Sequence, residues 1–456
     1  MRLVTPPLVV EENDSFKNDA LDRKAYGDAL LNIVMRSNDE LVISLDGKWG
    51  EGKTTFVKMW QGLLSENSVP NIYIDAFSND YVDDAFISVV SAIMNYAETH
   101  ITKEHKEKVA ELKVKAKKIG GQLLSWSTRI GIKAATLGAI RDAEIEELME
   151  IKGDMAKSVS DLIGGFVEER INSHTKDIEL IQSFRELLSN LPSKLQENGD
   201  KPLVIIIDEL DRCKPTFAVE IIEKIKHLFS VKNVVFVLVM NKSQLEESIK
   251  SVYGQNIDAH TYLQKFINLE AKIPKRTRER YINDLSKYSK KLLQLHELET
   301  WGDDRSIIEC IELLADHFNL SLRQLEKVYT NLAVFYGSSA EDHLRLVPLI
   351  VFLAVVKVID PRLFDQLLLQ QTSFGEVIKE LKLDNLSEEN RNNRELYTLI
   401  NYWIRWALLS EQEFKELPED DEIKNNGSSL RRYNISRDRL IPFFAQKLSM
   451  FVVTDG

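Results

Sequence analysis

The chain has 456 residues, with 44% apolar and 29% charged side chains and a formal net charge of −12. These values exclude collagen-like, low-complexity and disorder-dominated chains, and they predict two or three domains with at least one large core. The acidic excess argues against attraction of the whole surface to nucleic acid or anionic lipid. Two cysteines, Cys213 and Cys310, cannot form a disulfide framework, and this low cysteine count predicts a cytoplasmic protein.

Hydropathy predicts a soluble protein without a membrane span. The longest apolar run, 346–356, is too short to cross a bilayer and is expected to be a buried helix. A second candidate, 119–140, carries Arg129 and Lys133 inside it, and charges at the centre of a span are costly. The N-terminus lacks the basic start and apolar core of a signal peptide.

Hydrophobic periodicity predicts that the chain begins with an α/β core. A helix is predicted over 15–37, a buried strand over 41–45, a helix over 54–64 and a second strand over 71–75. Residues 83–195 have a helical pattern. Strands are then predicted over 203–207 and 234–240, with a helix over 218–229 between them. Continuously apolar strands that alternate with helices are typical of a parallel sheet covered on both faces.

Beyond Pro274 the pattern is helical. Helices are predicted over 278–296, 304–336, 344–372 and 393–410, and the acidic, then Asn/Gly/Ser-rich segment 411–429 is predicted to be an exposed loop. The elements divide the chain into a P-loop core of 1–82 and 196–275, a helical insert of 83–195 between the second and third strands, and a helical C-terminal region of 276–456.

The strand over 41–45 leads into a sequence that matches the phosphate-binding pattern G-x-x-x-x-G-K-[ST] at every position. In such a loop, glycines let backbone N–H groups face phosphate oxygens at the positive end of the next helix. Lys53 is expected to reach the β- and γ-phosphates, and Thr54 to ligate Mg²⁺. For Trp49, packing is the plainer interpretation. The predicted nucleotide-binding residues of the loop are Gly47, Lys48, Trp49, Gly50, Glu51, Gly52, Lys53, Thr54 and Thr55.

The strand over 203–207 ends in two adjacent carboxylates, Asp208 and Glu209. Because side chains alternate along a strand, the two point in different directions. Asp208 is expected to face the metal, and Glu209 to polarise the attacking water as a general base. Two interpretations of Arg212 stay open: an ion pair with Asp211, or a role in ordering the site or contacting a phosphate. Cys213 is expected to pack.

Together these motifs resemble the KAP family of P-loop NTPases, which are signal-transducing ATPases related to the AAA+ branch. The resemblance rests on 47–54 and 208–213, with further matches at 19–23, 75–77, 235–242 and 262–267, and it extends over about 15–335. It implies ATP and Mg²⁺ as ligands, assembly into an oligomer or a complex with an effector protein, and a bacterial role in phage exclusion or a related defence.

The sequence departs from the family pattern in two places. Many members carry a pair of membrane helices in the insert, whereas 83–195 lacks adequate spans. Asn241 follows the fourth strand where an aspartate is usual, and as a sensor it can still hydrogen-bond to phosphate or water. No guanine-reading motif follows this strand, because Gln244 stands in place of the required aspartate, and ATP is therefore favoured over GTP.

Arginines beyond the core are candidates for sensing the γ-phosphate, because related ATPases use an arginine of a helical subdomain for this purpose. Arg323 lies at a predicted helix start, and the alternative for it is a solvent or ion-pair role. A basic cluster at 275–280 could contain an arginine finger that acts in trans, or it is a solvated helix start.

Segment 103–118 has seven lysines and three glutamates, which predicts a solvated helix face or a contact with an acidic protein or nucleic acid. The absence of interleaved aromatic residues makes nucleic acid the weaker partner. No histidine spacing indicates a structural zinc site. The main hypothesis is an ATP-hydrolysing regulatory NTPase whose nucleotide state rearranges the helical region. The alternatives are a nucleotide-gated scaffold with little hydrolysis and a small-molecule kinase.

Overall fold

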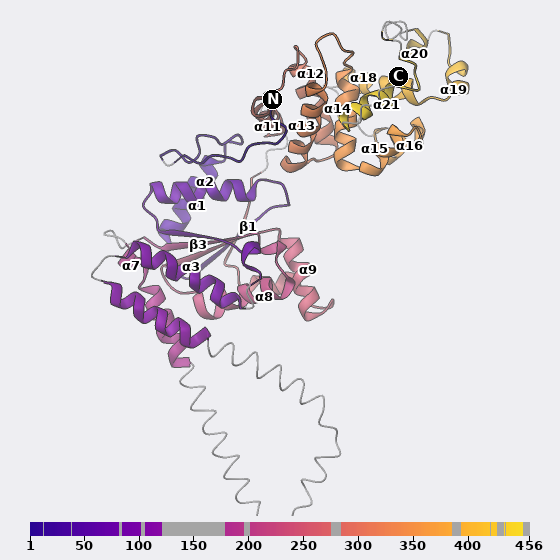
Figure 1. Ribbon diagram of the computed structural model, residues 1–456. Coiled ribbons are helices and arrows are strands. Elements are labelled where there is room, and N and C mark those ends of the chain that lie inside the picture. The colour runs from indigo at the N-terminus through magenta and orange to yellow at the C-terminus, as the bar shows by residue number, and fades with distance from the viewer. Residues whose placement is uncertain are drawn as a thin grey trace, which may run out of the picture.

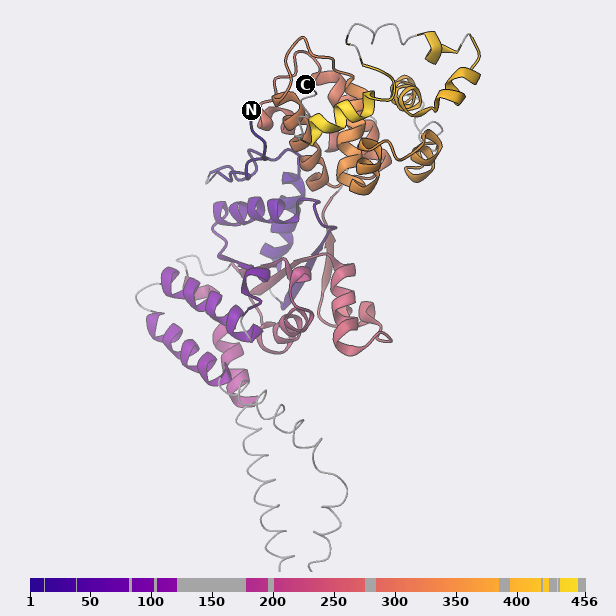
Figure 2. The same cartoon turned by 45° about the vertical axis from the view of Figure 1, so that its right-hand side comes forward.

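The computed structural model describes residues 1–120 apart from 12, 38, 82–83 and 102–104, together with 178–195, 201–274, 284–384, 394–425 apart from 420, and 433–449 apart from 434. It has an α/β part built on a parallel sheet, followed by a helical C-terminal region, as predicted (Figure 1). Figure 2 shows the same arrangement turned by 45° about the vertical axis. The prediction of a parallel α/β core with a helical C-terminal region is therefore confirmed.

The sheet has five parallel strands in the order β2-β3-β4-β1-β5. The strands are β1 (Leu41–Asp46), β2 (Asn71–Asp75), β3 (Leu203–Asp208), β4 (Val234–Met240) and β5 (Leu269–Lys272). The first four were predicted, and β5 was missed. Only Leu269 and Ala271 of this edge strand pack against the core, and Glu270 and Lys272 are exposed, so four residues with half their side chains polar give no apolar run.

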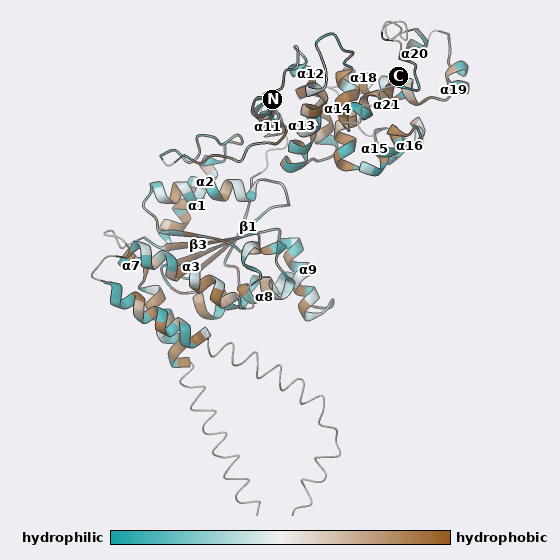
Figure 3. Ribbon diagram, in the orientation of Figure 1, coloured by the Kyte–Doolittle hydropathy of each residue, from teal (hydrophilic) through white to brown (hydrophobic). Residues whose placement is uncertain are grey.

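The two faces of the sheet are covered by different helices, and Figure 3 colours the strands between them as hydrophobic. On one face, α1 (Lys24–Arg36) and α2 (Lys53–Glu66) pack against β3 residues Val204 and Ile206. On the other face, Ile205 and Ile207 pack against α3 (Ala85–His100), α8 (Pro215–Lys224) and the helices 106–120 and 178–189. The described parts of 83–195 therefore share the core of the sheet. The boundaries between the three predicted domains stay a prediction.

Short elements complete the α/β part. They are the 3₁₀ turns η1 (Phe77–Asn79) and η3 (Leu210–Arg212), α7 (Pro192–Leu195), the π-helical turn η4 (Ile225–Phe229), α9 (Lys242–Tyr253) and α10 (Ala259–Gln264). The helix predicted over 15–37 begins only at Lys24. Before it, the Asp19 carboxylate accepts the backbone N–H groups of Leu21 and Arg23, which fixes a turn in place of a helix.

The C-terminal region consists of α11 (Asp284–His296), α12 (Asp304–His317), α13 (Leu322–Gly337), α14 (Val347–Ile359), α15 (Pro361–Leu368), α16 (Phe374–Glu380), α18 (Arg394–Leu408), α19 (Glu411–Glu416), α20 (Glu422–Asn425) and α21 (Leu440–Leu448). It has a hydrophobic core of its own. The apolar run 346–356 lies in α14, as predicted, and residues 347–356 are all buried. Among the described residues, no helix is long and apolar enough to cross a membrane, and most of 119–140 lies outside them.

Three predictions for this region were wrong in detail. The helix predicted over 304–336 is broken at Asn319, which has a φ of 48°, and α13 restarts with a capping box of Ser321 and Gln324. The helix predicted over 344–372 is broken at Asp360, whose carboxylate caps α15 before Pro361. The predicted loop 411–429 contains the short helices α19 and α20. In the first two cases a local capping side chain overrides the apolar periodicity, and in the third a capping box of Ser410 and Glu413 starts α19.

Candidate nucleotide-binding site

The predicted phosphate-binding loop lies between β1 and α2, at the edge of the sheet where all the parallel strands end. The backbone N–H of Gly47 donates to the carbonyl of Met240 at the end of β4, 3.2 Å away, which ties the start of the loop to the sheet. Gly50 and Gly52 have φ angles of 80° and 79°, a region that strains any residue with a Cβ. α2 begins directly at Lys53, so its free N–H groups face the loop.

Lys53 places its ammonium group inside this loop. Its Nζ donates to the carbonyl oxygens of Gly47, at 2.6 Å, and Lys48, at 3.3 Å, and the residue is only 9% exposed. Burial lowers the pKa of Lys53, while the charges of Asp211 and Asp208 oppose that change. The loop therefore holds a poorly solvated cation beside backbone amides, an arrangement that favours an anionic ligand.

Asp208 ends β3 next to the first turn of α2, as predicted. Tyr73 of β2 donates its hydroxyl hydrogen to Asp208 Oδ2 at 3.0 Å, and the Glu209 N–H donates to Oδ1 at 2.8 Å. The Thr54 hydroxyl also hydrogen-bonds to this carboxylate, whose pKa is raised mainly by burial. Thr54 and Asp208 are thus neighbouring oxygen donors, which are the ligands Mg²⁺ prefers, so the residues fit the metal.

Glu209 follows the strand in a left-handed conformation, with a φ of 60°. Burial raises the pKa of its carboxyl group, and the charge of Arg212 opposes the rise. Arg212 Nη1 donates to Glu209 Oε2 at 2.7 Å. The ion pair of Arg212 is therefore with Glu209, and the alternative of a pair with Asp211 is corrected. Asp211 accepts a hydrogen bond from the indole N–H of Trp49, which connects the tip of the loop to the same turn.

The loop and the acidic turn line a single cavity of about 530 Å³ together with the helical region. The Arg323 N–H at the start of α13 donates to the Gly50 carbonyl at 3.2 Å, so the helical region contacts the loop directly. The cavity brings together ten of the predicted site residues, namely Trp49, Gly50, Gly52, Lys53, Thr54, Thr55, Asp208, Glu209, Arg212 and Arg323. Trp49 is 47% exposed at its mouth, so burial in a core does not explain this side chain.

Four other predicted residues are not among the described residues that line the cavity: Gly47, Lys48, Glu51 and Asn241. Gly47 and Lys48 contribute their carbonyls to Lys53. The Glu51 carboxylate accepts the Lys48 N–H at 2.9 Å, inside the loop. The side-chain carbonyl oxygen of Asn241 accepts a hydrogen bond from the Ser243 hydroxyl at 2.8 Å, and its sensor role stays a prediction.

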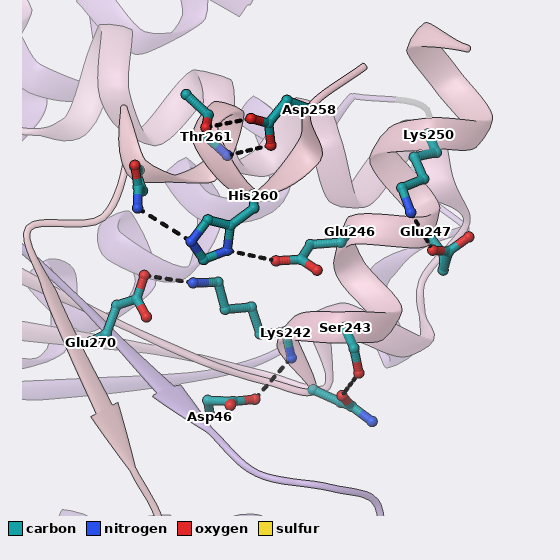
Figure 4. A network of polar contacts seen from close by, with 12 residues as sticks. Asp46, Lys242, Ser243, Glu246, Glu247, Lys250, Asp258, His260, Thr261 and Glu270 are labelled. Atoms are coloured by element: carbon teal, nitrogen blue, oxygen red, sulfur yellow. Dashed lines mark hydrogen bonds and ion pairs between the residues drawn. The ribbon is translucent and has the colours of Figure 1, made fainter. Parts of the chain in front are cut away.

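A polar network surrounds the start of α9 beside the loop (Figure 4). The Lys242 N–H donates to Asp46 Oδ1 at 2.9 Å, and its ammonium group pairs with Glu270 of β5 at 2.5 Å. Asp46 is the last residue of β1, so this network joins the ends of β1, β4 and β5. The missed edge strand therefore supports the base of the phosphate-binding loop.

Two other basic segments, 275–280 and 103–118, were predicted as candidate contact sites. The cluster at 275–280 lies outside the described residues. In the lysine-rich segment 103–118, Lys113 pairs with Glu98, and Lys115 pairs with Glu111 at 3.0 Å. Exposed pairs of this kind are typical of a solvated helix face.

Sequence reasoning missed two walls of the cavity. Arg23, which is buried, donates from Nη1 to the Glu51 carbonyl at 3.1 Å and so buttresses the loop from outside. Residues 5–9 and the helix α11 line the far end. The match at 19–23 was the only signal for Arg23, and nothing in the composition of 5–9 pointed to a ligand site.

Comparison with known proteins gives a family match and distant relatives. The model of the KAP family P-loop domain matches residues 23–338. An uncharacterized protein of Methanocaldococcus jannaschii is 29% identical over 177 residues, which cover 37% of this chain and 88% of that protein. The phage T7 exclusion protein of Escherichia coli is 19% identical over 363 residues, which cover 75% of this chain and 45% of that protein. The chain thus spans less than half the length of the second relative.

Solved structures give weaker similarity. The Aeropyrum pernix ORC2 protein, in its ADPNP-ADP complexes, aligns with a TM-score of 0.37 and 15% identity over 94% of each chain. Its ADP form aligns with a TM-score of 0.35 and 12% identity, over 98% of this chain and 96% of that one.

Proposed function

The chain belongs to the KAP family of P-loop NTPases, as its motifs predicted, and we propose that it binds and hydrolyses ATP with Mg²⁺ to switch its helical region relative to the α/β core. The observation that carries this proposal is that Lys53, Asp208 and Glu209 line one cavity. Phosphoryl transfer needs a cation on the phosphates, a metal ligand and a group that orients water, and these three side chains are of those types.

Each of the site residues would have a separate role in hydrolysis. Lys53 would exchange its two loop carbonyls for the β- and γ-phosphates, a stronger charge-assisted contact. Thr54 and Asp208 would hold Mg²⁺, which neutralises charge that develops on the phosphates. Glu209 would accept a proton from the attacking water at a carboxylate oxygen. The test is phosphate release from ATP, compared between the wild type and the Glu209→Gln variant.

Coupling to the helical region is supported by how closely α13 approaches the loop. A Cβ built on Gly50 would lie 2.9 Å from both Arg323 Cβ and the Ser321 hydroxyl oxygen. Because nothing larger than glycine fits there, a change in the loop on exchange of ATP for ADP would displace the start of α13. We therefore propose that nucleotide state sets the position of the helical region.

Replacing Arg323 with alanine is expected to lower the rate of phosphate release by roughly 10- to 100-fold, because a charge-assisted hydrogen bond to phosphate contributes about 1.5–3 kcal/mol. The measurement is steady-state hydrolysis at saturating ATP. Arg305→Ala is the matched control, because its side chain is 90% exposed on α12 and pairs with Glu309 of the same helix. Equal rates for Arg323→Ala and Arg305→Ala would remove Arg323 from the site.

The name of one relative supports a biological role for this activity. Its similarity to the phage T7 exclusion protein leads us to propose a role in phage exclusion, with assembly of copies or of an effector driven by ATP. Light scattering on a Glu209→Gln variant measures the assembly, with an increase in mass expected only when ATP is present. A mass that is independent of ATP would contradict assembly of copies.

A further inference from the structure

Residues 2–10 form an extended strap along one side of the cavity, anchored at both ends. We infer that this strap gates the exit of the bound nucleotide, and that His296 is the positioning residue that holds the strap on the helical region. The inference rests on the proposed function in that a nucleotide must enter the cavity. In Figures 1 and 2 the N-terminus lies beside α11, far from the sheet to which the chain then returns.

The first anchor lies on α2 of the α/β core. The Val9 carbonyl accepts a hydrogen bond from the Asn18 side chain at 3.0 Å. The Ser15 N–H donates to the Glu66 carboxylate at 2.7 Å. A Cβ built on Gly62 would lie 2.4 Å from Ser15 Cβ and 3.2 Å from Val10 Cγ1, so the chain packs on α2 at the one place where that helix has no side chain. This end of the strap is therefore fixed to the core.

The second anchor is His296, the last residue of α11, which is 0% exposed. The Arg2 N–H donates to the His296 carbonyl at 2.7 Å, and the imidazole Nδ1 lies 2.8 Å from the Arg2 carbonyl. Because a carbonyl only accepts, Nδ1 carries the hydrogen, and Nε2 is left to accept from the Thr5 hydroxyl 3.0 Å away. Burial lowers the pKa of His296, which favours this neutral form.

Between the anchors, Thr5 to Val9 line the same cavity as the phosphate-binding loop. Val9, which lines the cavity, is 68% exposed, so little of the protein packs over the strap at this residue. Pro6 and Pro7 restrict φ to values compatible with an extended chain and lack N–H groups, so neither residue can donate a backbone hydrogen bond. The surface pair of Arg2 with Glu297, 3.1 Å apart and half-exposed, contributes little. The buried contacts of His296, together with the packing of Met1 on Gly337 of α13, therefore hold this end of the strap.

The strap also joins the two parts of the chain that the proposed switch would move. It runs from α2 to the end of α11, so a displacement of α11 away from the core must stretch it or break one anchor. The His296 end is held by three hydrogen bonds and by Met1, which packs on Gly337 of α13, and the α2 end is held by two hydrogen bonds and by packing on Gly62. We expect opening at the His296 end to let the nucleotide leave, because Thr5, which lines the cavity, is held there.

The test measures dissociation of a fluorescent ATP analogue from the full chain, chased with unlabelled ATP. His296→Phe keeps an aromatic ring and removes both side-chain hydrogen bonds, and Thr5→Val removes one of them at constant shape. Since a hydrogen bond contributes about 1 kcal/mol, Thr5→Val is expected to speed release about fivefold, and His296→Phe more. The double variant should release no faster than His296→Phe, because both changes remove the same contact.

Thr99→Val is the matched control, because its hydroxyl bonds to Asn95, Tyr96 and His100 of α3, and Thr99 is not among the described residues that line the cavity. Release at the wild-type rate from His296→Phe and Thr5→Val would overturn the gate. Failure of the wild type to bind the analogue would instead overturn the proposed function. Hydrogen exchange without nucleotide then tests the anchor itself: the Arg2 amide should exchange faster in His296→Phe, and unchanged exchange would overturn the anchor.

Discussion

Replacing Lys53 with alanine is expected to weaken binding of ATP by roughly 10- to 100-fold or more, since hydrogen bonds to charged groups contribute about 1.5–3 kcal/mol each. The expected loss is large because the ammonium group is held inside the loop by the carbonyls of Gly47 and Lys48, and is already largely stripped of water. A phosphate that replaces these carbonyls therefore gains a charge–charge contact at little desolvation cost. Isothermal titration calorimetry with ATP and Mg²⁺ measures the change.

The matched control is Lys58→Ala, on the same helix α2 but with an exposed side chain. It should bind ATP as the wild type does. Lys53→Ala should still fold, because the buried Asp208 carboxylate keeps its hydrogen bonds from Tyr73 and from the Glu209 N–H. An unchanged affinity in a folded Lys53→Ala variant would show that the loop does not bind phosphate in the expected way.

The part of the site that the sequence predicted is the part whose geometry is local. The loop over 47–54 needs only glycines, a lysine and a threonine at fixed spacing between a strand and a helix, so its form follows from eight residues. The same holds for Asp208 and Glu209, because an apolar strand that ends in carboxylates places them at the edge of the sheet where the loop also lies.

The parts that could not be predicted depend on contacts between distant segments. The strap over 2–10 reaches the cavity because His296, almost three hundred residues away, accepts from it and donates to it. Tyr73 resembles any other strand residue until β2 lies next to β3 and its hydroxyl meets Asp208. Lys242 connects Glu270 of β5 to Asp46 at the end of β1. These pairings join distant segments, so the local hydrophobic periodicity does not predict them.

The pairing of Arg212 with Glu209 affects how well the Glu209 carboxylate can accept a proton. A guanidinium at 2.7 Å stabilises the ionised carboxylate and orients it, but it also lowers the basicity that a general base needs. Arg212 lines the cavity as well, so a γ-phosphate can compete with Glu209 for it. Hydrolysis would then require that the nucleotide draw Arg212 away from Glu209. A scaffold that only binds the nucleotide would not need this step.

Replacing Glu209 with glutamine is expected to lower phosphate release by roughly 100- to 10,000-fold, the range over which a general base contributes, while ATP affinity stays close to that of the wild type. Glutamine keeps the shape of the side chain, and its carbonyl oxygen can still accept from Arg212, so the change removes proton acceptance and leaves the turn in place. Single-turnover hydrolysis and ATP titration on the same preparation measure the two quantities.

Glu247→Gln, which removes the charge of an exposed partner of Lys250 on α9, is the matched control and should hydrolyse ATP as the wild type does. The alternatives to hydrolysis make different predictions for the Glu209→Gln change. A scaffold would release phosphate equally slowly with and without this change, and a kinase would transfer phosphate only when an acceptor molecule is added. Equal rates for the wild type and Glu209→Gln would therefore exclude Glu209 as the base, because glutamine cannot accept the proton from water.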